Sequence, residues 1–334
     1  MGNDIKTIQV GIAGATGPVG QKLIHLIAND LRYEICELAA SDSRSGQRYA
    51  DVTDYREKSA LPSKIANMKL VEASSLKSPY ILSCLPADSA LTLEPLWIKR
   101  GQHVLSNASS FRMNPDVPLL IPEINSAHLS LIKKQKGPGY HVTNPNCSTV
   151  FVCMGVWPLL QLGSLRHLSV VTLQASSGAG YPGVPSLDLL GNTIPYISGE
   201  EEKIETETKK ILGSPESPAN FMVTAQVNRV PVAHGHTVVL QLEFVDSVQV
   251  EHAEKIFQDL SKSMPDSYQY YNGSMPAQPQ PARVLSDLDM RAHVGKLRQG
   301  AEKNRLCLVV LGHNLVRGAA GAALANLNAL TDLT

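Results

Sequence analysis

The stretch that decides the fold reads GIAGATGPVG, from Gly11 to Gly20. It follows an apolar run, Thr7–Ala13, that predicts a strand, and it opens the amphipathic run Val19–Asn29, which predicts a helix. A second strand is predicted over Glu34–Ala40. This βαβ opening, with glycines between strand and helix, predicts a parallel sheet of the kind that binds dinucleotides.

The glycine turn has the chemistry of a phosphate cradle. Gly14, Gly17 and Gly20 let the backbone approach a pyrophosphate at a helix N-terminus, and Pro18 fits the first helical turn, where a missing N–H has no consequence. The spacing is GxxGxxG rather than the usual GxGxxG. The alternative is a tight strand-to-helix turn without a ligand, and the βαβ frame favours the dinucleotide.

The segment Ser41–Ser45 bears on the choice between NAD and NADP. It lies about 20 residues beyond the turn, where NAD enzymes place a carboxylate on the ribose. Ser41, Arg44 and Ser45 offer hydroxyls and a guanidinium to a 2′-phosphate, so NADP is favoured. Asp42 alone suits NAD, and a solvated loop is the alternative to both.

Length and composition predict two domains and no membrane or nucleic-acid partner. The chain has 334 residues, 30 basic and 30 acidic side chains, and a mean hydropathy of −0.07. A chain of this length usually exceeds one core, and no apolar run approaches the roughly 20 residues of a membrane span. No Lys/Arg stripe marks a nucleic-acid binder. Met1–Thr7 is polar and leads directly into the first strand, so no signal peptide is expected.

The apolar runs indicate a first domain over residues 1–133 and a second over 134–313. Tyr80–Leu85, His103–Leu105 and Leu119–Ile121 predict further strands of the parallel sheet. Beyond them the pattern indicates longer strands, and this half of the chain is expected to be richer in antiparallel strands. The elements expected there are a helix over Ser148–Leu160, strands over His167–Gln174, Phe221–Val230 and Thr237–Val245, an extended loop over Ser274–Ala282 and an alanine-rich helix over Gly318–Leu324.

One of the five cysteines is a candidate nucleophile. Cys147 follows Asn144-Pro145-Asn146 and begins an apolar helix, where free backbone N–H groups and the helix dipole are expected to lower its pKa and favour the thiolate. Cys36, Cys84, Cys153 and Cys307 lie within or beside apolar runs and are expected to be small buried hydrophobes. No CxxC pair is present, so neither disulfides nor a metal is expected, and the compartment is most simply the cytoplasm.

Two histidines are candidates for the proton acceptor. His234 and His236 lie between predicted strands, and alternation cannot choose between them because Pro231 and Gly235 interrupt the ladder. A structural role is the alternative for either. His236 directly precedes the apolar strand Thr237–Leu242 and is anchored at its base, so it is preferred.

Together these segments resemble the aspartate-β-semialdehyde dehydrogenase family over nearly the whole chain. The resemblance rests on Gly14–Gly20, Asn144–Thr149, Gln174 with Ser177–Gly180, and Arg229–Val232 leading to Gly235-His236. Pro195–Lys203 resembles the branch found in archaea, fungi and some bacteria.

The resemblance implies a Rossmann-like NADP-binding α/β domain and an α+β catalytic and dimerisation domain, with residues 314–334 packing back onto the first domain. It implies reversible, NADPH-dependent reduction of L-aspartyl 4-phosphate to L-aspartate 4-semialdehyde through a cysteine thioester. That reaction serves lysine, diaminopimelate, threonine and methionine biosynthesis. The implied partners are these small molecules and further copies of the chain, as a homodimer or a dimer of dimers.

The resemblance also implies roles for single residues. Cys147 is the nucleophile, His236 the acid and base, and Gln174 orients the reacting carbonyl. The implied substrate-binding residues are Arg112 and Lys203 for phosphate, Arg229 for the carboxylate and Glu200 for the ammonium group. The implied cofactor-binding residues are Gly14, Thr16, Gly17, Pro18, Val19, Ser41, Arg44, Ser45, Ser83, Ser177, Gly178 and Asn314. For Glu200 and Lys203 the alternative is an ordinary charged helix over Glu200–Lys210, with Ile204, Ile211 and Leu212 buried.

The sequence departs from the family pattern in three places. His313 replaces a usual Asp, Asn228 stands where Cys is common, and Asp287–Gly300 keeps only Val294-Gly295 and Arg298. These departures bear on cofactor and subunit contacts.

Two rival functions are weighed against this one. An acyl-CoA reductase, such as a malonyl-CoA reductase, would use the same Cys147 and His236, but Arg112 and Glu200 favour phosphate and an amino acid. A catalytically silent dinucleotide-binding homologue would have no need of these residues together.

Overall fold

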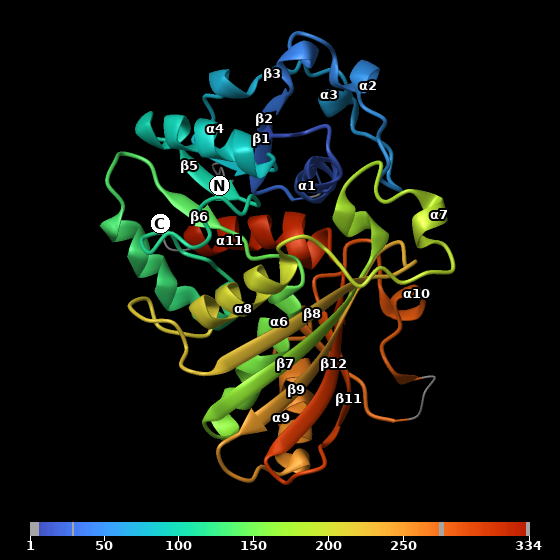
Figure 1. The fold of residues 1–334 in the computed structure, drawn as a ribbon. Coiled ribbons are helices and arrows are strands. Elements are labelled where there is room, and N and C mark those ends of the chain that lie inside the picture. The colour runs from blue at the N-terminus through green and yellow to red at the C-terminus, as the bar shows by residue number, and fades with distance from the viewer. Residues whose placement is uncertain (1–6, 29, 274–276, 332–334) are drawn as a thin grey trace, which may run out of the picture. The chain divides into compact units, whose positions relative to one another are not determined.

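The computed structural model describes residues 7–28, 30–273 and 277–331. Its chain divides into two compact units, drawn in Figure 1. The first comprises Met1–Pro122, Ser126–Pro145 and Ala319–Thr334, and the second comprises Glu123–Asn125 and Asn146–Gly318. The expectations for residues 1–6, 29, 274–276 and 332–334 lie outside the described residues. Within the described ranges, no helix is long and apolar enough to cross a membrane.

The first unit is built on a six-stranded parallel sheet of order β3-β2-β1-β4-β5-β6. Its strands are β1 (Ile8–Ala13), β2 (Tyr33–Ala40), β3 (Val71–Glu72), β4 (Tyr80–Ser83), β5 (His103–Ser106) and β6 (His141–Thr143). From β1 the chain adds β2 and then β3 on one side of the sheet, and from β4 it adds β5 and then β6 on the other side. The carboxyl ends of β1 and β4 therefore form the position where open parallel sheets bind ligands.

The apolar run Leu119–Ile121 is not a strand, contrary to the sequence-based expectation. Leu119 makes only an isolated parallel bridge to Thr143. The strand that pairs with β5 is β6, which begins after residue 133, and the first unit continues to Pro145. Leu119–Ile121 is apolar because it is buried, and burial alone does not determine strand pairing.

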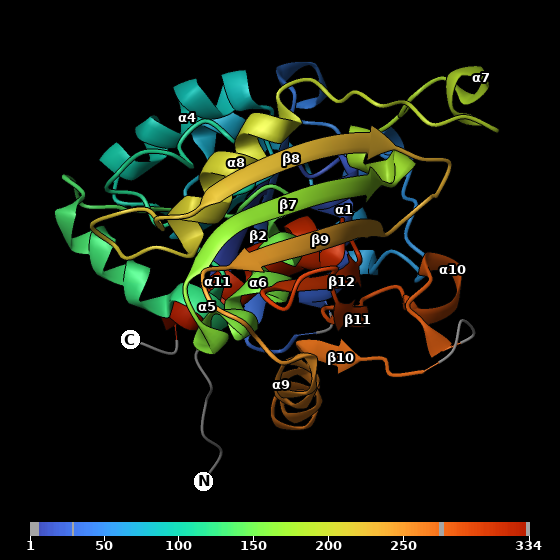
Figure 2. The same cartoon turned by 60° about the horizontal axis from the view of Figure 1, so that its bottom comes forward.

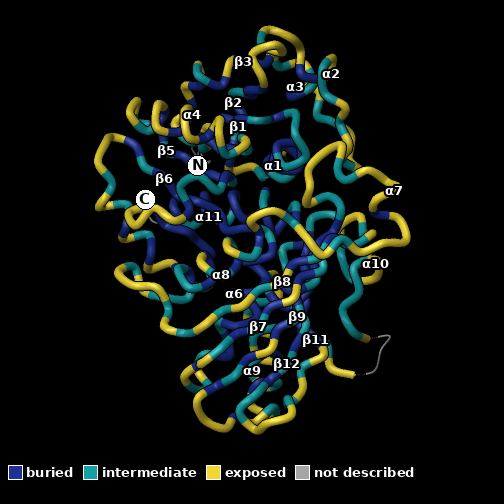
Figure 3. Tube along the Cα trace, viewed as in Figure 1, coloured by how far each residue is buried: buried dark blue, intermediate teal, exposed yellow. Residues whose placement is uncertain are grey.

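Helices cover both faces of this sheet. Alternate strand residues point to opposite faces, so Ile12 packs in one apolar cluster with α1 (Pro18–Ala28) and α11 (Gly321–Thr331). Its neighbour Ala13 packs in the other, with Trp97 of α4 (Ala87–Lys99). Figure 3 shows α11 buried over most of its length. The short helices are η1 (Asp42–Arg44), α2 (Tyr49–Val52), α3 (Ser63–Ala66), η2 (Ala73–Ser75), α5 (Pro122–Asn125) and η3 (Ser126–Lys134).

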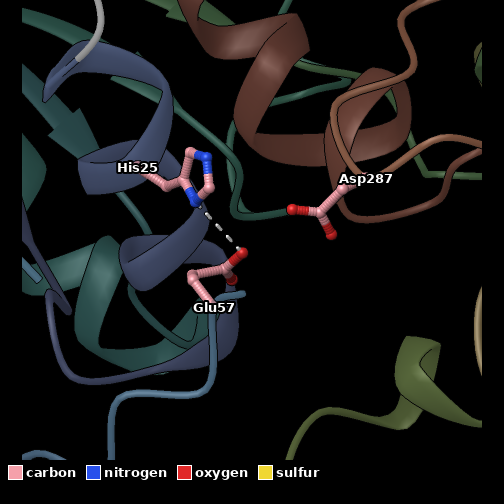
Figure 4. Close-up of side chains that lie close together, drawn as sticks. All are labelled: His25, Glu57 and Asp287. Atoms are coloured by element: carbon pink, nitrogen blue, oxygen red, sulfur yellow. Dashed lines mark ion pairs between the residues drawn. The ribbon is translucent and has the colours of Figure 1, made fainter. Parts of the chain in front are cut away.

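Polar side chains of α1 hold the loop that precedes α3. Lys22 pairs with Glu57. Nδ1 of His25 lies 3.7 Å from the Glu57 carboxylate (Figure 4). The same atom lies 2.9 Å from Oγ of Ser59. Asp287, also drawn in Figure 4, belongs to the second unit. These contacts fix the loop against the helix that follows the glycine turn.

The second unit contains a mixed six-stranded sheet of order β10-β11-β12-β9-β7-β8. Its strands are β7 (Leu165–Gln174), β8 (Met222–Arg229), β9 (His236–Phe244), β10 (Tyr268–Tyr270), β11 (Ala292–Gln299) and β12 (Arg305–Gly312). Antiparallel pairing joins β7 to β9, β9 to β12 and β12 to β11. The pairs β7·β8 and β10·β11 are parallel, so the sheet is mixed and, as expected, richer in antiparallel pairs (Figure 2).

One helix of this unit is shorter than the sequence predicts. The helix expected over Ser148–Leu160 is α6 (Thr149–Val156) followed by a 3₁₀ segment, η4 (Trp157–Leu162), because Pro158 has no N–H to continue the α-helix. The remaining helices are η5 (Ser176–Ala179), α7 (Ser186–Leu189), α8 (Glu200–Ile211), α9 (Val250–Ser263) and α10 (Pro281–Val284). A π-helical turn, η7 (Val316–Ala320), follows β12.

Helix α8 covers the free edge of β8. Oε1 of Glu205 accepts the N–H of Ala225 at 2.9 Å, and Oε1 of Glu201 accepts that of Val227 at 3.3 Å. Two residues further on, Arg229 and Ile194 exchange backbone hydrogen bonds of 2.8 and 3.0 Å. Alternate residues of the edge strand are therefore paired within the chain, and the sheet ends at β8.

Candidate active site

Cys147 lies at the N-terminus of α6, in a turn stabilised by its neighbour. Oδ1 of Asn146 accepts the N–H groups of Ser148 at 2.9 Å and Thr149 at 3.3 Å. These two donors would otherwise lack a partner inside the helix. Cys147 thus stands at the positive end of the helix dipole, the position from which the sequence predicted a nucleophile.

A buried histidine faces the thiol. Sγ of Cys147 lies 3.2 Å from Nε2 of His236, the first residue of β9. The backbone N–H of Ala175 donates to Nδ1 of the same ring at 3.0 Å, so the neutral ring carries its proton on Nε2. That proton points at the sulfur, where a thiolate can accept it.

The environment of His236 keeps the ring neutral. Burial, together with the positive charge of Arg229 and the proximity of His313, lowers the pKa of His236 to about 3. A protonated ring would also direct an N–H at the N–H of Ala175. The resting pair is therefore a neutral imidazole that donates to sulfur.

His234 does not face the thiol. It is exposed, its Nδ1 lies 3.1 Å from Oγ of Ser177, and its ring stacks on that of His313 with centroids 5.4 Å apart. Gly235 turns the chain between the two histidines at φ +99° and donates its N–H to Oδ1 of Asn314 at 2.9 Å. The structure therefore places His236 beside Cys147.

Gln174 and Arg229 end the adjacent strands β7 and β8 and are register partners. Both are buried, and Nη1 of Arg229 donates to the carbonyl of Ala175 at 2.7 Å. Burial lowers the pKa of this guanidinium, and the nearby Cys147 and Glu200 oppose that shift. A Cβ on Gly178 would lie 2.8 Å from Nη1 of Arg229 and 2.9 Å from Cε1 of His236, so only glycine leaves both side chains in place.

Glu200 opens α8 and joins several of these residues. Its Oε2 accepts from Nδ2 of Asn146 at 2.7 Å and from Nε2 of Gln174 at 3.4 Å. Its Oε1 pairs with Nζ of Lys203 at 2.9 Å. Six of the expected catalytic and substrate residues therefore lie in the second unit: Cys147, Gln174, Glu200, Lys203, Arg229 and His236.

Arg112 belongs to the first unit. It is buried, and its Nη2 donates to the carbonyl of Asn107 at 2.7 Å.

The expected cofactor residues are divided between the units. Gly14, Thr16, Gly17, Pro18, Val19, Ser41, Arg44, Ser45 and Ser83 lie in the first, and Ser177, Gly178 and Asn314 in the second. In the second unit, Nδ2 of Asn314 donates to Oγ of Ser177 at 3.0 Å.

The residues of the first unit fit a dinucleotide. Gly14 has φ +76°, and a Cβ on Gly20 would lie 2.4 Å from the carbonyl oxygen of Gly14, so the turn requires glycine at both positions. Arg44 is exposed and donates from Nη1 to Oγ1 of Thr16 at 2.9 Å, which places a cation beside the turn. Oγ of Ser83 is buried without a partner among the described residues. These features suit a pyrophosphate and a neighbouring phosphate group.

Two residues that the sequence did not single out are central to the site. In the sequence, Asn146 is part of the Asn-Pro-Asn segment before Cys147, and Glu207 is one of several charges in the helix expected over Glu200–Lys210. Glu207 is only 2% exposed and its Oε2 accepts the N–H of Asn146 at 2.6 Å. The signal was its spacing, because Glu207 follows Glu200 by seven residues and lies on the face of Ile204 and Ile211.

Comparison with known proteins identifies the family. Residues 9–132 match the family described as semialdehyde dehydrogenase, NAD binding domain, and residues 156–317 match semialdehyde dehydrogenase, dimerisation domain. An aspartate-semialdehyde dehydrogenase of Archaeoglobus fulgidus is 42% identical over 95% of this chain and 96% of the relative. One of Schizosaccharomyces pombe is 37% identical over 95% of this chain and 96% of the relative.

A solved structure has the same fold. It is the aspartate semialdehyde dehydrogenase of Candida albicans with NADP, which superposes with a TM-score of 0.83 at 31% identity and covers 95% of this chain and 97% of its own. The family expected from the motifs, including its archaeal and fungal relatives, is thereby confirmed. This chain belongs to the aspartate-semialdehyde dehydrogenase family.

Proposed function

We propose that this chain catalyses the reversible, NADPH-dependent conversion of L-aspartyl 4-phosphate to L-aspartate 4-semialdehyde. The observation that carries the proposal is the 3.2 Å contact between Sγ of Cys147 and Nε2 of His236 at the start of α6. A nucleophile within hydrogen-bond reach of an oriented histidine is the arrangement that covalent catalysis requires. The named activity of the relatives supports the same assignment.

In the first half-reaction, the thiolate of Cys147 attacks the acyl carbon of the acyl phosphate. The carbon–oxygen bond to phosphate breaks, phosphate leaves with the bonding pair, and a thioester forms on Sγ. Arg112 and Lys203 are proposed to bind the phosphate, since a guanidinium and an ammonium group suit its charge. Gln174 is proposed to orient the reacting carbonyl.

In the second half-reaction, the thioester is reduced and the aldehyde released. NADPH, when bound, supplies the hydride. His236 donates a hydrogen bond from Nε2 to the carbonyl oxygen as that oxygen gains negative charge. The carbon–sulfur bond then breaks, which regenerates the thiolate and leaves the aldehyde. In the oxidative direction the same Nε2–H of His236 is proposed to donate a hydrogen bond to the alkoxide oxygen that forms when the thiolate adds to the aldehyde, so the ring stays neutral.

The two charged ends of the aspartyl group require partners of opposite charge. Arg229 is proposed to bind the carboxylate, and its burial makes an unpaired cation costly, which favours an anionic ligand. Glu200 is proposed to bind the ammonium group, in exchange for part of its contact with Lys203.

NADP(H) is the proposed cofactor. The glycine turn, Ser83, Ser177, Gly178 and Asn314 are proposed to hold the dinucleotide. Arg44, with Ser41 and Ser45, is proposed to bind the 2′-phosphate that distinguishes NADP from NAD. The NADP named with the Candida albicans structure supports this choice.

The chain is proposed to act as a homodimer, or as a dimer of dimers, in the cytoplasm. Its match to a dimerisation domain supports the dimer. The five cysteines are free thiols, which supports a reducing compartment.

One assay tests the proposed function. Purified protein is given aspartate semialdehyde, phosphate and NADP⁺ or NAD⁺, and in a parallel reaction malonyl-CoA and NADPH, and absorbance of the reduced coenzyme is followed. We expect turnover of the semialdehyde and none of malonyl-CoA. The Cys147→Ser variant should be inactive, because an alcohol is scarcely ionised near neutral pH. Turnover of malonyl-CoA alone, or an active Cys147→Ser variant, would refute the proposal.

A further inference from the structure

A buried carboxylate on α8 has no role in the chemistry described above. Glu207 is 2% exposed and lies in a stripe otherwise formed by Ile204, Thr208 and Ile211, with Glu200 at its start. Burying a carboxylate is costly unless it is paired or hydrogen-bonded. Its Oε2 accepts the backbone N–H of Asn146 at 2.6 Å, a short, charge-assisted hydrogen bond.

Each polar group of Asn146, the residue that Glu207 contacts, makes a hydrogen bond. Besides its N–H, Asn146 donates from Nδ2 to Glu200 at 2.7 Å and accepts on Oδ1 from Ser148 and Thr149. Its carbonyl accepts the N–H of Val150 at 3.2 Å. Asn146 is therefore fixed to α8 by two carboxylates and to α6 by three backbone N–H groups.

Cys147 is the next residue, so the position of Asn146 determines where the thiol lies. On its other side, a Cβ built on Gly318 would lie 2.9 Å from Cβ of Cys147, so little room exists for the thiol to move in that direction. The contact to His236 at 3.2 Å depends on this placement.

We propose that Glu207 is a positioning residue that sets the thiol of Cys147 against His236 by holding the backbone of Asn146. The inference rests on the proposed role of Cys147 as nucleophile. Glu207 acts on the backbone of Asn146, while Glu200 acts on its side chain and also faces Gln174. One helix thereby aligns the thiol and the proposed substrate-binding carboxylate.

The prediction is tested with Glu207→Ala, Glu207→Asp and Glu207→Gln. A glutamine carbonyl can accept the same N–H, whereas aspartate is one methylene too short and alanine has no acceptor. Misplacement of a reacting group by about 1 Å costs on the order of 10²-fold in rate. We therefore expect kcat to fall by about that factor in Glu207→Ala, and clearly in Glu207→Asp, with Glu207→Gln close to the parent and KM for NADP⁺ unchanged.

A second measurement is independent of the reaction catalysed. The rate at which iodoacetamide alkylates Cys147, followed on the peptide that contains it, should fall in the same order as kcat. Glu205→Ala is the matched control, because Glu205 also accepts a backbone N–H, at 2.9 Å from Ala225, on the same helix. It should alkylate and turn over like the parent even if its Tm falls.

The two readouts separate failure of this inference from failure of the proposed function. Slower alkylation in Glu207→Ala and Glu207→Asp supports the positioning role even if the parent proves not to act on aspartate semialdehyde. Alkylation of these variants at the parent rate overturns it, as does an equal loss in Glu205→Ala. If Glu207→Ala does not fold, the aspartate and glutamine variants decide, and equal rates in these two would also overturn it.

Discussion

Gly318→Ala is expected to disable the thiol by adding a single methyl group. The new Cβ would lie 2.9 Å from Cβ of Cys147 and 3.2 Å from its Cα. Carbon atoms normally approach to about 3.5–4.0 Å, so Cys147 or the segment that carries Gly318 has to retreat by about 0.6–1 Å. Such overpacking usually costs about 1–3 kcal/mol in the free energy of unfolding.

The displacement bears directly on the site. Sγ of Cys147 starts 3.2 Å from Nε2 of His236, and a retreat of about 0.6–1 Å away from that ring would lengthen the contact to about 3.8–4.2 Å and weaken it. We expect kcat to fall by about 10²-fold and Cys147 to be alkylated more slowly by iodoacetamide. The assay follows NADP⁺ reduction with aspartate semialdehyde and phosphate, beside peptide mass analysis of the alkylated thiol.

Gly155→Ala is the matched control for this variant. Its Cβ would also be crowded, at 2.7 Å from Cδ1 of Leu240 and from Cγ2 of Val310, which are buried side chains of the sheet. Its position at the C-terminal end of α6, opposite the end that carries the thiol, means that its Tm should fall while the alkylation rate stays at the parent value. A Gly318→Ala variant with parent kcat, or a Gly155→Ala variant that slows alkylation equally, would refute the reasoning.

Three further predictions concern the cofactor, the phosphate and pH. Arg44→Ala should lower kcat/KM for NADP⁺ more than for NAD⁺, since only NADP⁺ carries the 2′-phosphate; equal losses would remove Arg44 from that role. Arg112→Lys should raise KM for phosphate more than KM for the semialdehyde, because a lysine loses the bidentate fork; an unchanged phosphate KM would make the arginine structural. The pKa of His236 is lowered to about 3 from an ordinary value of about 6.5, so the stability it contributes is complete above pH 6.5 and is lost as pH falls towards 3. His236→Gln should therefore reduce the slope of unfolding free energy against pH in that window, by at most roughly 1.4 kcal/mol per pH unit, and an unchanged slope in urea titrations would contradict the shift.

The sequence predicted those parts of the fold that local pattern determines. The glycine turn between β1 and α1 has a local signature, and so has the thiol at the start of α6. Strand pairing depends on distant segments, so Leu119–Ile121 was assigned to the sheet although β6 occupies that place. The three residues of β6 are too few to show a period.

A site residue could be predicted where its chemical type and its place in a recognisable element are both visible in one short segment, as for Cys147 at the start of an apolar helix. Spacing could not separate His234 from His236, because the choice depends on the turn at Gly235 and on the N–H of Ala175, which the fold alone brings to Nδ1. Glu207 was missed because a glutamate in a charged helix is usually solvated. Its seven-residue spacing from Glu200 marks it as buried, but its contact with Asn146 depends on packing between α6 and α8, which the spacing does not show.

The cover that α8 places over β8 limits how copies of this chain can associate. The carboxylates of Glu205 and Glu201 already occupy the N–H groups of Ala225 and Val227, and Ile194 occupies Arg229. A second copy that added a strand at this edge would first have to displace two anions from their hydrogen bonds. At this edge, subunit association is thereby directed to side-chain surfaces rather than to a continuous backbone ladder. Surfaces of that kind can change by point substitution while the backbone pairing of the sheet itself is preserved.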